Sequence, residues 1–162
     1  MLLEKFCGCR AILKAHGSDE VNVAVKQSSY QNMINTLVGR KKIRCFLDFH
    51  NLKHTRPEIV NIGTVGGEIL QTPEKKKRFN AFLECFDRHK IPTSIDIPFN
   101  GRGTLAHRVG GGNIFALQLE INSIIEHRKN QKLLNSVINA LVDFIKLYND
   151  HRDLDLPGRD RI

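Results

Sequence analysis

The sequence predicts an α/β protein with a mixed central sheet and helices on both faces. Short strand-like runs alternate along the chain with longer segments whose apolar residues recur at helical spacing, an order typical of layered α/β domains. The chain has 162 residues, of which 41% are hydrophobic and 26% are charged. This length and this balance predict one globular domain over residues 1–162.

Three helices are expected from the spacing of the apolar residues. In residues 30–42, apolar side chains recur at the spacing of one helical face. A second helix opens at Thr72 and Pro73, which are residue types that suit the cap and the first turn. The longest helix, over residues 129–149, carries a broad apolar stripe that we expect to pack on the sheet.

Apolar runs predict the strands, and polar or glycine-rich segments predict the connections. Strands are expected over residues 10–15, 43–49, 58–63, 93–99 and 113–122. A glycine-rich loop is expected over residues 100–112, and it matches neither the dinucleotide-binding nor the phosphate-binding pattern. Residues 151–162 are polar, so we expect a loosely held tail.

The composition also predicts where the protein works. No run approaches the 18 apolar residues that cross a membrane, and the first residues, MLLEKFCGCR, lack the pattern of a secretory signal. The four cysteines do not have the paired spacing of a metal framework, which favours free thiols in a reducing compartment. We therefore expect a cytoplasmic protein with no membrane partner, and we leave its oligomeric state open.

The net charge of +8 and the isoelectric point near 9.5 raise the question of whether the protein binds nucleic acid. However, the lysines and arginines are scattered, and their two short runs, GRKKIR and PEKKKR, flank predicted helices. No basic stretch is interleaved with aromatic residues. We expect a solvated basic surface and rank nucleic-acid binding last.

Polar side chains close several of the predicted strands. Asp48 and His50 end the strand over residues 43–49, Asn100 follows the strand over 93–99, and Glu120 lies near the end of the strand over 113–122. Ligand sites of open α/β sheets form at the carboxyl ends of strands, so we expect these groups to converge on one edge.

Each of these groups has a chemical and a structural interpretation. His50 is a candidate metal ligand that Asp48 would align, and Glu120 is a candidate general base for a metal-bound water. Alternatively, His50 is a structural residue and Glu120 pairs with an arginine. Arg56, Arg102 and Arg108 lie in adjacent segments and suit an anionic ligand, although any one of them is also a normal surface residue.

Four motifs together resemble the N-formylglutamate amidohydrolase family of zinc carboxypeptidase-like hydrolases. They are Asp48–His50, Arg56–Pro57, the IPFNG segment at residues 97–101, and the ALQLEIN strand at residues 116–122. The last match is the most specific, and the resemblance covers roughly residues 43 to 150. The SDEVN segment at residues 18–22 is also similar to the family, but more weakly.

The resemblance implies a phosphorylase/hydrolase-like α/β fold, one zinc ion and hydrolysis of the amide bond of a small carboxylate-bearing N-acyl or N-formyl amino acid or peptide. By the same match, His50 would be a zinc ligand and Glu120 the catalytic base. The residues implied near the substrate are Arg56, Asn100, Arg102 and Asn22.

The chain departs from the family in the segment before residue 43, where the family supplies a first histidine and a carboxylate ligand. His16 and Asp19 have a suitable spacing, but they follow the wrong strand. Two explanations are open. The chain lacks the N-terminal part of a longer enzyme, or it is an inactive relative that acts as a binding module for an anionic ligand or a protein partner.

Overall fold

The structure is a computed structural model that describes residues 7, 9, 29–40 and 43–150. Its sheet has four strands in the order β1-β4-β2-β3. The strands are β1 (Cys45–Leu52), β2 (Val60–Gly63), β3 (Thr93–Ile95) and β4 (Phe115–Asn122). β1 pairs with β4 and β2 with β3 in parallel, whereas β2 and β4 are antiparallel. The prediction of an α/β protein with a mixed sheet is therefore confirmed.

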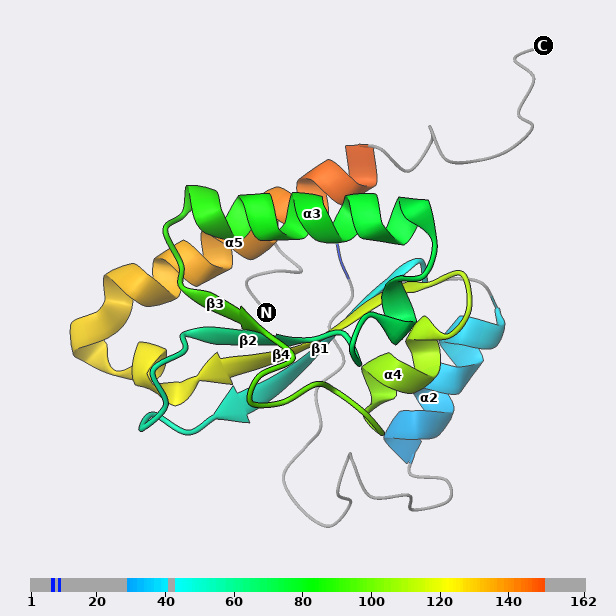
Figure 1. The fold of residues 1–162 in the computed structure, drawn as a ribbon, viewed down its shortest axis with the longest axis horizontal. Coiled ribbons are helices and arrows are strands. Elements are labelled where there is room, and N and C mark those ends of the chain that lie inside the picture. Colours follow the sequence, from blue (N-terminus) through cyan, green and yellow to red (C-terminus); the bar gives the residue numbers. More distant parts are fainter. Residues whose placement is uncertain (1–6, 8, 10–28, 41–42, 151–162) are drawn as a thin grey trace.

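Two long helices cover one face of this sheet. α3 (Pro73–Arg88) and α5 (Gln131–Asp150) lie side by side above it in Figure 1. The core between these layers is aromatic: Phe82, Phe86, Phe115 and Phe144 are almost fully buried. The rings of Phe82 and Phe144 meet edge to face, with centroids 4.9 Å apart. Each such burial contributes about 2–3 kcal/mol, which makes this layer the main source of stability.

Within the described residues, the opposite face is covered by helices over only part of its length. α2 (Ser29–Gly39) and the short α4 (Leu105–Gly110) lie on this side (Figure 1). They pack a second apolar cluster against Phe46 of β1 and Ala116 of β4. Beyond these two residues, the next two positions on this face are polar in both strands: Asp48 and His50 in β1, and Gln118 and Glu120 in β4.

The structure corrects two of the expected elements. The strand expected over residues 93–99 ends at Ile95, because Asp96 has a φ of 58° and turns the chain out of the extended conformation. The glycine-rich loop contains α4, whose first turn is capped by Thr104: its side chain accepts a hydrogen bond from the amide of His107 at 3.4 Å. The strand expected over residues 10–15 and the tail over 151–162 lie outside the described residues.

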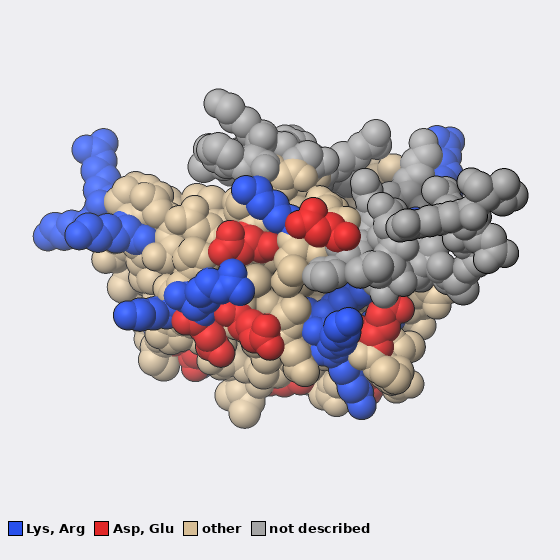
Figure 2. Space-filling view, turned by 90° about the horizontal axis from the view of Figure 1, so that it is seen from above, with Lys and Arg blue, Asp and Glu red and all other residues tan. Residues whose placement is uncertain are grey.

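The outer layer of the described residues carries charges of both signs (Figure 2). Among the helices of the described residues, none combines the length and the apolar character needed to cross a bilayer. Figure 2 shows basic and acidic side chains interspersed on the face seen from above. This mixture is typical of a solvated surface.

Candidate functional site

The strand register gathers polar residues from three strands on the face of the sheet that carries α2 and α4. His50 of β1 lies opposite Glu120 of β4, and Glu120 lies opposite Asn61 of β2. One row earlier, Asp48 lies opposite Gln118. Residues that are in register on neighbouring strands point to the same face, so these five side chains form one polar cluster. We call it the polar face.

His50 and Asp48 form the first pair of this cluster. Nε2 of His50 lies 3.3 Å from Oδ1 of Asp48, close enough for an ion pair but not aligned as a hydrogen bond, and this buried nitrogen has no other hydrogen-bond partner in the described residues. The other carboxylate oxygen of Asp48 accepts a hydrogen bond from the amide of Ala106, in the first turn of α4, at 3.3 Å. The Asp48 carboxylate raises the pKa of His50 above its ordinary value, more than burial lowers it.

Glu120 is the second acid of the polar face, and only 8% of its surface is exposed. Its Oε1 accepts a hydrogen bond of 2.6 Å from Nε2 of Gln118. Burial raises the pKa of Glu120 above its ordinary value, although the charge of His50 and the hydrogen bond from Gln118 oppose this shift. A carboxyl group whose pKa is raised in this way is better matched to proton transfer near neutral pH.

The expectation that three strand ends converge on one edge is only partly right. β1 and β4 are parallel, so Asp48, His50 and Glu120 do come together toward their carboxyl ends. β3 runs with β2, which is antiparallel to β4, so the loop after β3 leaves in the opposite direction. Gly101 in this loop nevertheless approaches Gln118, so the loop borders the polar face at its earlier row.

The residues expected near the substrate lie around this cluster rather than in it. Arg56 is exposed between β1 and β2, with its guanidinium 6.0 Å from the ring centroid of Phe99. The side chain of Arg102 forms an exposed ion pair with Glu68. Asn100 is exposed, and its side-chain oxygen accepts the amide of Arg102 at 3.0 Å. Arg102 therefore has a protein partner, which the sequence did not predict.

Two further expected residues, Asn22 and His16, lie outside the described residues, as does Asp19. This matters for the metal, because catalytic zinc generally takes three protein ligands. Within the described ranges, no group of three histidine, cysteine or acidic residues is arranged to hold a metal ion. The imidazole of His50, with Asp48 beside it, suits one metal ligand, but the described residues do not complete a zinc site.

Sequence reasoning missed Asn61 and assigned no role to Gln118. Asn61 is fully buried, and its amide nitrogen donates to Oγ of Ser94 at 3.0 Å and to the carbonyl of Ile97 at 2.6 Å. Gln118 has a readable signal, since it lies two residues before Glu120 and therefore on the same face of a strand. Asn61 has none, because its place depends on the antiparallel pairing of β2 with β4.

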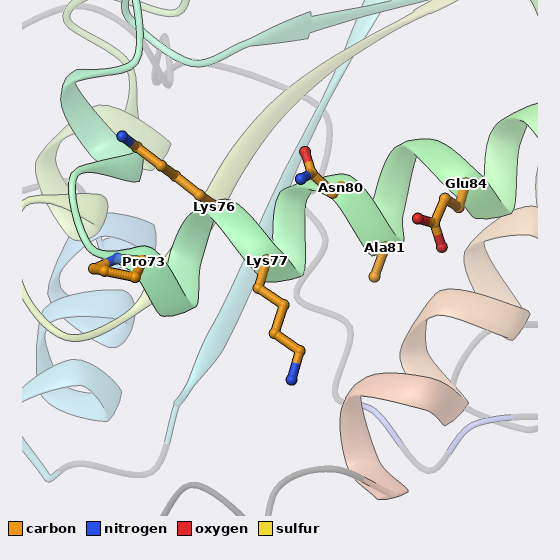
Figure 3. Close-up of a pocket in the computed structure, with 6 residues that line it drawn as sticks. All are labelled: Pro73, Lys76, Lys77, Asn80, Ala81 and Glu84. Carbon is orange, nitrogen blue, oxygen red and sulfur yellow. The ribbon is translucent and has the colours of Figure 1, made fainter.

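A pocket on the opposite layer does not belong to this site. It lies along the exposed side of α3 and is shown in Figure 3. Its lining residues are Pro73, Lys76, Lys77, Asn80, Ala81 and Glu84. α3 packs on the face of the sheet that carries Phe115 and Leu117, away from the polar face.

Comparisons of the chain with protein-family models, with curated proteins and with solved structures found no match in any of the three.

Proposed function

We propose that this chain is a zinc-dependent amidohydrolase acting on a small carboxylate-bearing N-acyl or N-formyl amino acid or peptide. The observation that carries the proposal is the register of β1 with β4, which sets His50 and Glu120 opposite each other on one face. An imidazole oriented by a neighbouring carboxylate and a buried carboxyl group of raised pKa are the two groups that metal-assisted hydrolysis needs side by side.

In this proposal each group has one role. His50 would hold the zinc ion through Nδ1, because Nε2 lies 3.3 Å from Oδ1 of Asp48 and that carboxylate would fix the orientation of the ring from the Nε2 side. When bound, zinc would polarise the amide carbonyl and acidify a water molecule. Glu120 would accept the proton of that water and pass it to the leaving amine, a role worth about 10²–10⁴-fold in rate. The remaining metal ligands would come from residues outside the described ranges.

The substrate carboxylate would bind at the rim of the polar face. Arg56 is the better candidate, because within the described residues its guanidinium has a contact with an aromatic ring and no acidic partner. Arg102 would have to exchange Glu68 for the substrate. Since that ion pair is exposed, the exchange costs little, about 1 kcal/mol or less.

The test is to measure zinc stoichiometry and hydrolysis in parallel. His50→Ala should lose zinc and activity, whereas Glu120→Gln should retain zinc and lose about 10²–10⁴-fold in kcat on formyl-amino-acid or short N-acyl-peptide substrates. His54→Ala is a matched control, because this exposed histidine lies four residues further along the chain in the loop after β1. Unchanged zinc in His50→Ala would show that the ligand is assigned wrongly.

A second candidate function is a non-enzymatic binding module for an anionic ligand or a protein partner. It is favoured by the lack of a three-residue metal group among the described residues. Exposed apolar side chains at Ile95, Ile97 and Phe99, in β3 and the loop after it, also suit a protein partner. Sub-stoichiometric zinc with no hydrolysis, together with retained binding of a carboxylate ligand, would select this candidate.

A further inference from the structure

We infer that Gln118 is a positioning residue for Glu120, and that backbone contacts at Gly63 and Gly101 hold Gln118 in place. The inference rests on the proposed role of Glu120 as the proton acceptor. It adds a residue that acts through Glu120 and does not itself touch the reacting atoms.

The orientation of the Gln118 amide follows from its partner. Its Nε2 lies 2.6 Å from Oε1 of Glu120, and an ionised carboxylate can only accept hydrogen bonds. The nitrogen must therefore face Glu120. As a consequence, Oε1 of Gln118 points the other way, where it is buried and has no hydrogen-bond partner among the described residues. A buried, unpaired oxygen lowers stability, and an apolar residue at this position would avoid that cost.

Two glycines create the space for this amide. A Cβ atom on Gly63 would lie 3.0 Å from Oε1 of Gln118 and 2.9 Å from the backbone nitrogen of Gly101. A Cβ atom on Gly101 would lie 2.8 Å from the same oxygen. The backbones of β2 and of the loop after β3 therefore enclose the oxygen end of the amide, which restricts its rotation.

The result is a carboxyl group held from one side. Gln118 occupies Oε1 of Glu120, so Oε2 is the oxygen that remains for proton transfer. The amide also fixes the plane of the carboxyl group, because both side chains lie on the same face of one strand at alternate positions. Orientation of this kind is a large part of the rate gain that a general base provides.

The test is Gln118→Met, which keeps the length of the side chain and removes the donor. The readout is the carboxyl ¹³C chemical shift of Glu120 at neutral pH, assigned with Glu120→Gln, together with kcat and KM. We expect the signal to move, kcat to fall roughly 10- to 100-fold and KM to stay within about twofold. Leu119→Met is the matched control, because Leu119 is the adjacent residue on the opposite face and its volume is conserved.

An unchanged Glu120 signal in folded Gln118→Met would overturn the inference. If that variant does not fold, Gly101→Ala supplies the same test, because its Cβ displaces the amide and should move the same signal. The spectrum needs neither zinc nor hydrolysis. Absence of hydrolysis would therefore refute the proposed function. The movement of the Glu120 carboxyl signal in Gln118→Met would still test whether Gln118 positions Glu120.

Discussion

Replacing Gly101 by alanine tests whether the loop after β3 is packed against the polar face. Gly101 has a φ of 82°, and an added Cβ would lie 2.8 Å from Oε1 of Gln118 and 3.4 Å from Cα of Gly63. The substitution therefore introduces two separate costs. One is the left-handed backbone conformation of an alanine, and the other is the overlap with Gln118.

Gly103 separates these two costs. It has the same φ of 82°, but a Cβ at this position would meet no atom of the described residues within 4 Å. Gly103→Ala should therefore lower the free energy of unfolding only by the cost of a left-handed alanine, about 1–2 kcal/mol. Gly101→Ala should lose this and a further 1–3 kcal/mol or so for overpacking, about 2–5 kcal/mol in total.

The assay is urea denaturation of the wild type and of both variants, with the free energy of unfolding extrapolated to water. A shift of the midpoint at constant slope would identify a change in stability rather than in the unfolded state. Equal losses for the two variants would refute the reasoning, because the close approach of Gly101 to Gln118 would then have no energetic consequence.

Three further predictions follow from the same structure. Asp96→Ala should lower the free energy of unfolding, measured by urea denaturation, by about 2–4 kcal/mol, because the Asp96 carboxylate accepts hydrogen bonds of 2.6 Å from both the amide and the hydroxyl of Thr64. Asp96→Gly should lower it by less, because glycine adopts the positive φ of 58° at this position without strain. Lys75→Met should cost about 2–3 kcal/mol, because its buried ammonium donates to two backbone carbonyls at 2.7 and 2.5 Å. The pKa of His50 is raised in the folded protein, so protonation of this imidazole favours the folded state. This contribution to the free energy of unfolding is present in full below the unfolded pKa of 6.5 and is lost as the pH rises through the folded pKa. Asp48→Asn should therefore flatten the dependence of stability on pH between these two pKa values, measured by thermal unfolding against pH.

Much of the fold was readable from periodicity. β1 and β4 were predicted because apolar residues recur along them, and the same alternation correctly set Asp48 beside His50 and Gln118 beside Glu120. α3 was predicted at its first residue because Thr72 and Pro73 are specific to helix starts, and the Thr72 side chain does accept the amide of Lys75. These signals are local, so a single sequence contains them.

The missing parts depend on contacts between distant segments. The direction of β2 and β3 relative to β4 is not encoded in any one strand. Without it, neither the position of Asn61 nor the course of the loop after β3 could be predicted. The ion pair of Arg102 with Glu68 joins residues 34 positions apart. α4 was missed because its helix is six residues long and is surrounded by glycines, which hide a helical period.

The most direct test of the account is the pKa of the His50 imidazole, measured by NMR titration in the wild type and in Glu120→Gln. If the two side chains belong to one site, removing the negative charge of Glu120 should lower the pKa of His50, since that charge contributes to raising it. Glu68→Gln should leave it unchanged, because Glu68 pairs with Arg102 at the border of the polar face. An imidazole that titrates identically in the wild type and in Glu120→Gln would contradict a shared site for His50 and Glu120.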